Sequence, residues 1–519
     1  MNSNASAPKP DERSRQGFNV ELRKKKVNLN ATKSRAEFFA STPSVNPAPL
    51  GESNYSSDLK AEDFNLAILK EINDRLSNFM QLPLSEVIPL VAQVRVAASD
   101  EENNDILIFS GIAKTIVDLA LSPHAADEDL LSTILWIIAN IAAGDSSHTA
   151  AIVQSGGIET LVHITKNFTT PVTIDNTTYA LANIAGESAE YRIIITNTEI
   201  HTFLLRYFET VSDDDFCSNE EYVNVIKHAA WLFSNICRVS QGYRLHYETY
   251  KQFFPFWLRV FVAQSPASFH VLWSLVFCTG SLNDAEAAQL INYFGNYIVE
   301  YAFSYVRGAD HRFAAMRALG NLSSGKLASD YFIKNNIIQL ATEQLCSPNT
   351  QDTFKRYLRE LLWAMSNLFA TCSADLVNEA LNASPQFFLL ILKTASPNSP
   401  PQLRTDAIWN IGNLILKLDN AIILTYVQQT DLIHTLIEVQ DFRDSTAIEL
   451  SVEALLEIFG RFTDEPEIYE ELVRLFIEKD GERYLRHLSL HRSSSVRESI
   501  NKLSYMVTDD AEESDDYNF

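Results

Sequence analysis

Glycine, proline and cysteine are scarce in this chain of 519 residues, which contains 16 Gly, 17 Pro and 5 Cys. Because residues that break helices are few, and because Leu, Ile and Ala recur at helical spacing, the composition favours an all-helical class. The cysteines are odd in number, scattered and never arranged as CxxC. This pattern predicts reduced thiols of a cytosolic or nuclear protein.

The chain also lacks a long apolar run. The longest, LLSTILWIIANIAAG at 130–144, is shorter than the roughly 18–20 residues that a membrane span needs, and it contains Ser, Thr and Asn. The N-terminus has no apolar core of the kind found in secretory signals. We therefore expect neither membrane insertion nor secretion.

Catalytic and metal-binding motifs are missing as well. The segment GNLSSGKL has the GxxxxGK spacing of a phosphate-binding loop, but Leu327 replaces the Ser or Thr that holds Mg²⁺ and the preceding residues have a helical pattern. His487 and His491 stand four residues apart without an accompanying Glu or third ligand. No nucleophile elbow, zinc helix or Cys/His cluster is found, so the sequence predicts no catalytic residue, metal or cofactor and a protein that is not an enzyme.

Charge is unevenly distributed along the chain. The net charge is −24, yet residues 1–35 hold nine Lys or Arg against three acids, which leaves 33 basic and 63 acidic residues, a charge of −30, for the rest. An acidic body with a short basic arm favours basic peptides over nucleic acid as the ligand. It also predicts that the arm can bind the body of the same chain.

Against these absences stands one repeated feature, an aromatic residue followed four positions later by Asn. The pairs are Trp136/Asn140, Tyr179/Asn183, Trp231/Asn235, Trp363/Asn367 and Trp409/Asn413. Arg317/Asn321 keeps the Asn, and Trp273 belongs to the series without its Asn. Successive anchors lie 43, 52, 42, 44, 46 and 46 residues apart. This is the period of armadillo-type helical repeats, roughly 40–47 residues each.

The spacing within each pair suggests how the repeats would act. Residues i and i+4 share a helix face, so stacked repeats would line a concave surface with parallel rows of Trp and Asn. An Asn amide can bind the N–H and C=O of an extended peptide, and slots between Trp faces can accept the stem of Lys or Arg with cation–π attraction. Core packing alone explains a large apolar residue in each repeat, but not a polar amide four residues later.

The expected architecture is all-α, a right-handed superhelical armadillo-repeat solenoid of about ten repeats. We assign residues 1–60 to a disordered basic arm and linker, 61–507 to the solenoid, and 508–519 to an acidic disordered tail. An acidic insertion at 213–221 accounts for the long spacing of 52. The segment at 451–462 lacks the pair, as expected of a capping repeat.

The sequence resembles the importin-α (karyopherin-α) family over nearly its whole length. The closest local matches are AAWLFSNICR, WIIANIAAG, YALANIAGE, LRELLWAMSNL and RTDAIWNIGNL, and NVELRKKK resembles the family's importin-β-binding segment. The resemblance implies an adaptor that shuttles between cytoplasm and nucleus, holds Lys/Arg-rich nuclear localisation signals in its groove and joins this cargo to importin-β through the arm. It further implies an export receptor at the C-terminal repeats.

By position, the resemblance also assigns site residues. The major groove would be formed by Trp136, Asn140, Gly144, Thr149, Tyr179, Asn183, Glu187, Trp231, Asn235 and Trp273, with Gly144, Thr149 and Glu187 around its deepest lysine pocket. The minor groove would be formed by Arg317, Asn321, Glu360, Trp363, Asn367, Asp406, Trp409 and Asn413. The importin-β-binding and self-inhibiting residues would be Arg13, Arg15, Arg23, Lys24, Lys25, Lys26, Lys33 and Arg35.

Several positions depart from the family pattern. Tyr179 replaces the usual Trp, Glu187 the usual Asp, Ala143 the usual Ser and His270 a usual acid. Our hypothesis is that the major groove is weakened relative to the minor one. The second basic cluster of the arm is reduced to Lys33 and Arg35, so self-inhibition is expected to be leaky. The alternative reading is a catenin-like armadillo scaffold for adhesion or signalling, although such grooves are typically basic.

Overall fold

The computed structural model describes residues 60–240, 242–347 and 351–508. These residues form helices joined by turns and short connections. No strand occurs among them beyond an isolated bridge between Ser240 and Tyr243. The predicted all-α class is thereby confirmed. The described residues divide after Cys278 into an N-terminal unit and a C-terminal unit, which we describe separately.

Each unit contains long helices that carry the aromatic–Asn pairs or occupy the equivalent place in their repeat; we call these the ladder helices. In the N-terminal unit they are α4 (Leu84–Ala97), α7 (Glu128–Ala143), α10 (Pro171–Glu187), α14 (Glu220–Cys237) and α17 (Ser268–Thr279). In the C-terminal unit they are α19 (Ala309–Leu322), α22 (Asp352–Thr371), α25 (Pro401–Ile415), α28 (Ser445–Arg461) and α31 (Ser494–Thr508).

Shorter flanking helices lie between successive ladder helices in the chain. Those of the N-terminal unit are α3 (Leu66–Leu76), α5 (Asn104–Phe109), α6 (Ile112–Leu119), α8 (Ser146–Gln154), α9 (Gly157–Asn167), α11 (Ala189–Asn197), α12 (Ile200–Thr210), α13 (Asp213–Ser218), α15 (Tyr247–Gln252) and α16 (Phe254–Val262). Those of the C-terminal unit are α18 (Asp284–Phe303), α20 (Lys326–Lys334), α21 (Ile337–Leu345), α23 (Ala374–Ala383), α24 (Gln386–Ala395), α26 (Asn420–Gln429), α27 (Leu432–Ile437), α29 (Pro466–Glu478) and α30 (Gly481–Ser489).

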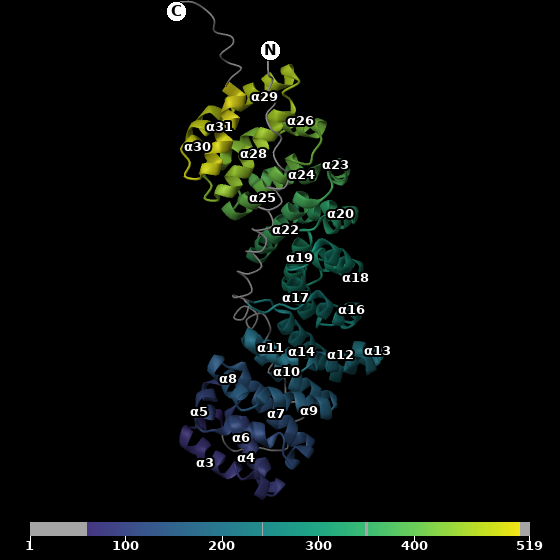
Figure 1. The fold of residues 1–519 in the computed structure, drawn as a ribbon, viewed down its shortest axis with the longest axis vertical. Coiled ribbons are helices and arrows are strands. Elements are labelled where there is room, and N and C mark those ends of the chain that lie inside the picture. The colour runs from purple at the N-terminus through teal and green to yellow at the C-terminus, as the bar shows by residue number, and fades with distance from the viewer. Residues whose placement is uncertain (1–59, 241, 348–350, 509–519) are drawn as a thin grey trace, which may run out of the picture. The chain divides into compact units, whose positions relative to one another are not determined.

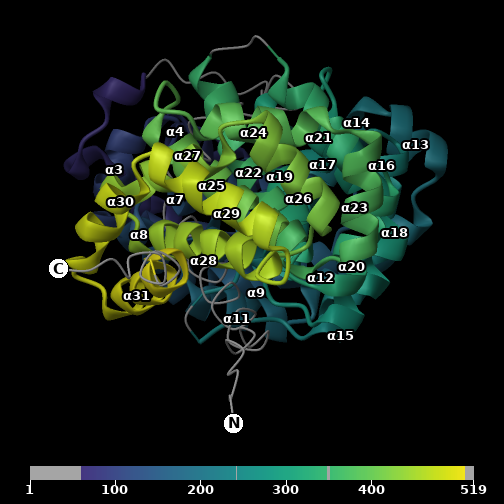
Figure 2. The same cartoon turned by 90° about the horizontal axis from the view of Figure 1, so that it is seen from above.

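Ladder helices of neighbouring repeats pack directly on one another. In the N-terminal unit α4, α7, α10 and α14 contact one another in chain order, as Figure 1 shows. In the C-terminal unit the order is α19, α22, α25, α28 and α31, and Figure 2 shows α25, α28 and α31 side by side. Successive anchors carried by these helices therefore lie on helices that contact each other.

Side-chain caps mark where α7, α10 and α14 begin. The side chain of Asp127 accepts a hydrogen bond from the N–H of Leu130 at the start of α7, and Thr170 caps α10 just before Pro171 at its first position. Asn219 caps α14 in the same way. Such caps satisfy N–H groups that have no partner within the helix and stabilise it by about 1 kcal/mol each.

The acidic insertion forms a helix of its own. Residues 213–218 make up α13, whose first turn holds Asp213, Asp214 and Asp215, and α14 follows after the cap Asn219. Acidic side chains stabilise the N-terminal turn of a helix. The longer spacing between Tyr179 and Trp231 thus comes from an added turn of helix, and the ladder itself continues.

Within each unit the ladder helices pack through buried apolar side chains. On α14, for example, Ile226, Leu232, Phe233 and Ile236 are fully buried. Within the described residues no helix combines the length and apolar composition of a membrane span.

Candidate functional site

The predicted anchors lie on equivalent faces of consecutive ladder helices. We define the first anchor row as Trp136, Tyr179, Trp231 and Trp273 on α7, α10, α14 and α17, and the second anchor row as Arg317, Trp363 and Trp409 on α19, α22 and α25. The first row belongs to the N-terminal unit and the second to the C-terminal unit. Trp231 and Trp363 are buried to 9% and 8% exposure, whereas the other Trp residues of the rows and Tyr179 are half-buried.

The Asn residues of the pairs tie each repeat to the one before it. Nδ2 of Asn183 donates to the carbonyl of Ala139 at 3.1 Å, and Nδ2 of Asn235 to the carbonyl of Ala182 at 2.9 Å. In each case the acceptor directly precedes the Asn of the preceding repeat. We call these hydrogen bonds amide bridges.

The same register continues in the second row. Nδ2 of Asn367 donates to the carbonyl of Gly320 at 3.0 Å, and that of Asn413 to the carbonyl of Ser366 at 2.8 Å. At the start of the first row, Nδ2 of Asn140 likewise donates to the carbonyl of Ala98 at 3.1 Å. Asn321 differs, since its bond reaches the hydroxyl of Thr279 at 3.3 Å.

The amide bridges change the interpretation of the Asn row. Sequence reasoning assigned these amides to a bound peptide, whereas the structure uses one N–H of each amide within the protein. An Asn amide has two N–H donors and a carbonyl oxygen. The bridge uses one N–H, so it does not consume the second N–H or the oxygen, and it fixes the direction in which these two groups point. On Asn183, for instance, Oδ1 is buried and has no hydrogen-bond partner among the described residues.

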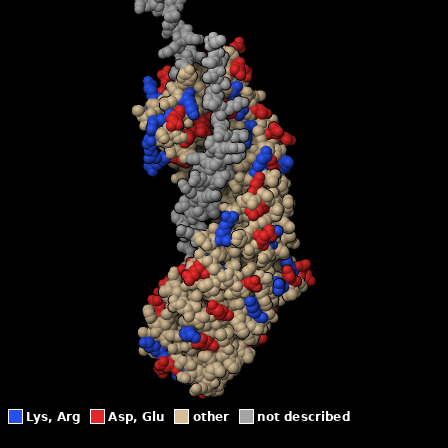
Figure 3. Space-filling view, viewed as in Figure 1, with Lys and Arg blue, Asp and Glu red and all other residues tan. Residues whose placement is uncertain are grey.

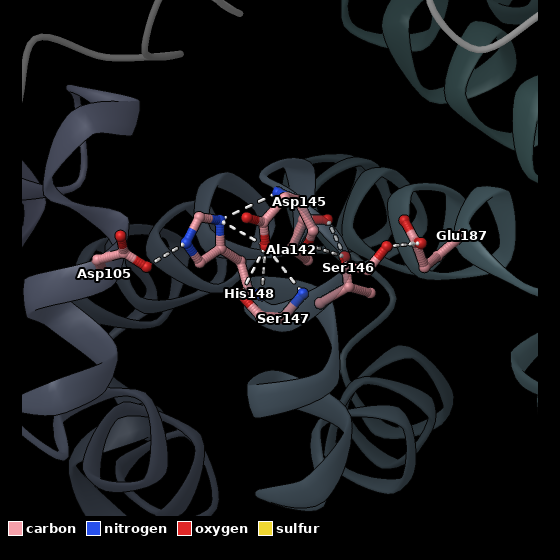
Figure 4. Close-up of polar contacts among 8 residues, drawn as sticks. Asp105, Ala142, Asp145, Ser146, Ser147, His148 and Glu187 are labelled. Carbon is pink, nitrogen blue, oxygen red and sulfur yellow. Dashed lines mark hydrogen bonds and ion pairs between the residues drawn. The ribbon is translucent and has the colours of Figure 1, made fainter.

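Residues predicted to surround a lysine pocket lie where α7 meets α8, and Figure 4 shows their polar contacts. Thr149 is fully buried, and its hydroxyl donates to the carbonyl of Ala142 at 3.0 Å. Glu187, at the end of α10, accepts a hydrogen bond from the hydroxyl of Ser146. Gly144 lies so close to His148 that any Cβ at position 144 would be 2.3 Å from Nδ1 of that ring. A side chain at this position would therefore displace the ring.

Two further carboxylates and a histidine at this pocket escaped sequence reasoning. The backbone N–H of Asp145 donates to Nδ1 of His148 at 3.0 Å, so the neutral ring carries its proton on Nε2, which lies 3.1 Å from Oδ1 of Asp105. The pKa of Asp145 is lowered, chiefly because the Ser147 hydroxyl donates to its carboxylate and also because the N–H of His148 does so. The carboxylates of Asp105, Asp145 and Glu187 thus all bond to residues in the first turn of α8.

Around Trp231 the first row is closed by direct ring contacts. The ring centroids of Tyr179 and Trp231 are 5.6 Å apart at an interplanar angle of 51°, and those of Trp231 and His270 are 6.4 Å apart at 33°. The open slot that the sequence predicted between parallel anchor faces is therefore not present between Tyr179 and Trp231. At the start of the row, the guanidinium of Arg95 lies over Trp136, 5.3 Å from its ring centroid.

The acids of the second row already face cations of the same chain. Arg317 makes a two-pronged ion pair with Glu360, with distances of 3.1 and 2.7 Å, and both side chains are buried. Arg359 lies 3.6 Å from Asp406. The indole of Trp363 rests on the backbone of Gly320, where any Cβ would be 2.3 Å from Cζ3.

One surface of the C-terminal unit departs from the acidic character of the chain. Figure 3 shows Lys and Arg side chains gathered over α30 and α31, where Arg483, Arg486 and Arg492 are exposed. The pKa of His491 is lowered, first by desolvation and then by Arg492 and other cations nearby.

The predicted residues of the arm lie outside the described residues, as does most of the segment assigned to the acidic tail. They are Arg13, Arg15, Arg23, Lys24, Lys25, Lys26, Lys33 and Arg35.

Neighbouring repeats pack through their ladder helices, and seven of the ten ladder helices carry an anchor. This arrangement defines the chain as an armadillo-repeat solenoid. The ten ladder helices agree with the predicted number of about ten repeats. A solved structure titled as an engineered protein has the same fold, with a TM-score of 0.68, 17% identity, and coverage of 86% of this chain and 99% of that one. A designed armadillo repeat protein in complex with the peptide (KR)4 aligns with 49% of the chain at a TM-score of 0.40 and 20% identity.

The curated relatives are importin α subunits, so the resemblance seen in the sequence motifs is confirmed. Importin subunit alpha-6 of Arabidopsis thaliana is 28% identical over 228 residues, 44% of this chain and 39% of that protein. The probable importin subunit alpha-A of Dictyostelium discoideum is 24% identical over 107 residues, 20% of each chain.

Importin subunit alpha-1b of Oryza sativa subsp. japonica is 26% identical over 104 residues, 20% of this chain and 17% of that one. The matched region therefore spans well under half the length of these relatives. No protein-family model matches the chain. The chain is a divergent, importin-α-like armadillo-repeat protein.

Proposed function

We propose that this chain is a nuclear import adaptor that binds Lys/Arg-rich nuclear localisation signals along its two anchor rows. The observation that carries the proposal is the repeated register of anchor and Asn on consecutive ladder helices. The similarity to importin α subunits supports it.

In this proposal the Asn amides bind the peptide main chain. Each amide bridge holds its amide in one orientation, so binding a peptide costs little side-chain entropy at these positions. Cationic side chains are attracted by carboxylates beside the rows, namely Asp145 and Glu187 in the first row and Glu360 and Asp406 in the second. Since Arg317 and Arg359 neutralise the second pair, a cargo cation would have to share these carboxylates with them.

The partners follow from the same similarity. The arm, residues 1–60, would bind importin-β and would also compete with cargo for the rows, because a tethered basic segment acts at an effective concentration in the mM range. An export receptor would bind the C-terminal repeats, and the protein would shuttle between cytoplasm and nucleus. The proposal includes no cofactor, no metal and no catalysis.

Titration of a labelled Lys/Arg-rich peptide by fluorescence anisotropy tests the central claim. We expect binding that weakens with added salt, and a loss of affinity of about tenfold or more in Trp409→Ala, which removes a half-buried anchor. The matched control is Tyr505→Ala, which removes an exposed aromatic residue of α31. Equal affinity in the two variants would contradict binding along the second row.

The catenin-like scaffold is the second candidate, and the preferred peptide separates the two. A scaffold of that class would bind an acidic peptide more tightly than a basic one, whereas the adaptor proposal requires the reverse.

Comparing Trp231→Ala with Trp409→Ala tests the hypothesis that the first row is the weaker one. This hypothesis predicts the larger loss of peptide affinity for Trp409→Ala.

Removal of residues 1–60 tests the competing arm. The shortened chain is expected to bind the basic peptide more tightly than the full chain, and importin-β is expected to bind only the full chain. An unchanged peptide affinity would show that the arm does not compete.

A further inference from the structure

The cations of α30 and α31 form one patch on an otherwise acidic chain. From the start of α30 to the end of α31, residues 481–508 hold five Lys or Arg against two acids. The two helices pack directly on each other, and Figure 3 shows Lys and Arg side chains gathered over them. We define the basic patch as the exposed cations of this stretch, which are Arg483, Arg486, Arg492 and Lys502.

Most of the basic patch lacks an acidic partner among the described residues. Arg483 lies 3.5 Å from Asp480, whereas no salt bridge within the described residues involves Arg486, Arg492 or Lys502. Cations on adjoining helices repel one another when no acid lies between them. An anion from outside the described residues would relieve this repulsion.

The start of α31 adds to the attraction for an anion. The N-terminal end of a helix is positive, so acidic side chains stabilise the first turn. The first turn of α31 contains no acid; Arg492 lies just before the helix and Arg497 is its fourth residue. The pKa of His491 is lowered first by desolvation and then by Arg492, Arg497 and His487, so these cations lie close to one ring. The helix end and the cations therefore act on the same place.

The segment that follows α31 has the complementary charge. Residues 509–519, DDAEESDDYNF, hold six acids and no cation, and they lie outside the described residues. We call them the tail segment. Because the tail segment is joined to α31, it acts on the basic patch at an effective concentration in the mM range. The acidic remainder of the body repels it, so the basic patch is the favourable surface within reach.

The length of the tail segment matches the distance that it has to cover. Helix α31 has 15 residues and is therefore about 22 Å long. An extended chain advances about 3.3 Å per residue, so about seven residues run back along the whole helix. In this arrangement Asp510 passes Lys502, and Asp515 and Asp516 reach the level of Arg492.

An apolar contact agrees with the same register. Leu490 precedes Arg492 by two residues and is 86% exposed. When Asp515 and Asp516 lie beside Arg492, the next residue, Tyr517, comes level with Leu490. Covering the leucine with the tyrosine ring removes apolar surface from water and adds to binding.

We propose that the tail segment binds back along α31 onto the basic patch, with Asp515 and Asp516 beside Arg492 and Tyr517 against Leu490. The bound tail segment covers the patch, so another polyanion binds there only by displacing it. This inference concerns the C-terminal unit alone and does not depend on peptide binding along the anchor rows.

A labelled peptide with the sequence of residues 509–519 tests the inference by fluorescence anisotropy at low salt. The full chain is compared with a neutral-tail variant, a full chain with six changes: Asp509→Asn, Asp510→Asn, Glu512→Gln, Glu513→Gln, Asp515→Asn and Asp516→Asn. The neutral-tail variant is expected to bind the peptide about tenfold or more tightly than the unmodified chain, whose own tail segment competes. Added salt is expected to weaken this binding.

Substitutions in the neutral-tail variant then locate the binding surface. Arg486→Gln with Arg492→Gln is expected to weaken peptide binding by about tenfold. The matched control is Lys326→Gln with Lys334→Gln, which removes the same charge from exposed positions of α20 and is expected to stay within about twofold. Thermal unfolding verifies that both variants fold.

The register has its own variant. Leu490→Ser leaves the charge unchanged and is expected to weaken peptide binding by about threefold; no change would overturn the contact with Tyr517. The inference as a whole is overturned if the full chain and the neutral-tail variant bind the peptide equally. It is also overturned if the arginine pair costs no more affinity than the lysine pair.

Discussion

The amide bridge of Asn367 offers a sharp test of how the repeats hold together. Asn367→Ala removes the hydrogen bond from Nδ2 to the carbonyl of Gly320 at 3.0 Å. Asn367 is 6% exposed and Gly320 is buried, so water cannot readily replace the lost donor. A buried polar group left without its partner costs about 1–3 kcal/mol.

Helix propensity partly offsets this loss. Ala is more favourable than Asn within a helix by about 0.5 kcal/mol. The expected net destabilisation is therefore roughly 0.5–2.5 kcal/mol. The variant Asn367→Asp keeps the side-chain size but places a carboxylate oxygen near the carbonyl of Gly320, so its loss is expected to be larger.

Hydrogen exchange measured by mass spectrometry reports the local loss of stability in the full chain. Segments from α19 and α22 are expected to exchange roughly 2- to 60-fold faster in Asn367→Ala, by the relation of 1.4 kcal/mol to each factor of ten. The control is Asn292→Ala, which changes an exposed Asn within α18 and gains the helix propensity without losing a bridge. If Asn367→Ala is as stable as this control, the amide bridges contribute nothing and the argument is wrong.

Three further predictions follow from contacts described above or from burial. Gly320→Ala is expected to destabilise the C-terminal unit by about 1–3 kcal/mol, because the added Cβ would overlap the indole of Trp363; thermal unfolding measures this. Glu360→Gln is expected to lower the free energy of unfolding by about 3–5 kcal/mol, since it leaves the buried Arg317 without its carboxylate. The double variant Glu360→Leu with Arg317→Met removes both charges and should be nearly neutral. Burial lowers the pKa of His201, so below pH about 6.5 the unfolded chain binds a proton that the folded chain does not, and stability falls as the pH falls; His201→Gln is expected to flatten this dependence.

Each of these predictions has a result that would refute it. For the glycine, Gly308→Ala is the control, because its Cβ would meet nothing closer than 3.7 Å, and an equal effect at both positions would disprove the overlap. For the ion pair, a double variant as unstable as Glu360→Gln would show that the effect does not come from an unpaired Arg317. An unchanged slope of melting temperature between pH 6.5 and 5 in His201→Gln would remove that histidine as a cause.

The repeat architecture could be predicted from the sequence because it depends on periodicity. An anchor every 42 to 52 residues within helical sequence is compatible with few folds, and the acidic segment at 213–221 accounted for the one long interval. Asp127 before α7 is a signal that could also have placed a helix start, since capping depends on neighbouring residues only.

The details of the rows could not be predicted, because they depend on contacts between repeats. The spacing of Trp231 and Asn235 puts them on one face, but it does not reveal that the amide is bonded to Ala182 on the preceding ladder helix. The ring contact with Tyr179 likewise depends on how closely α10 and α14 pack.

The role of the proposed site residues as a peptide-binding surface stays a prediction. The structure brings them onto adjacent ladder helices, which is what peptide binding would require, and it adds Asp145 and His148 to the pocket around Gly144. Neither residue belongs to the aromatic–Asn pairs, so the spacing of these pairs did not point to them.

The register of the amide bridges has a consequence for how such a chain can evolve. Where donor and acceptor occupy equivalent positions in adjacent repeats, as for Asn183, Asn367 and Asn413, each repeat offers an acceptor to the next repeat and a donor to the one before. Duplication or deletion of one such repeat would join a donor to an equivalent acceptor and orphan neither group. The Asn235 bridge forms even though α13 is inserted before its helix, so the pairing also tolerates insertions between ladder helices. Tandem gain and loss of repeats can therefore proceed without first redesigning their junctions.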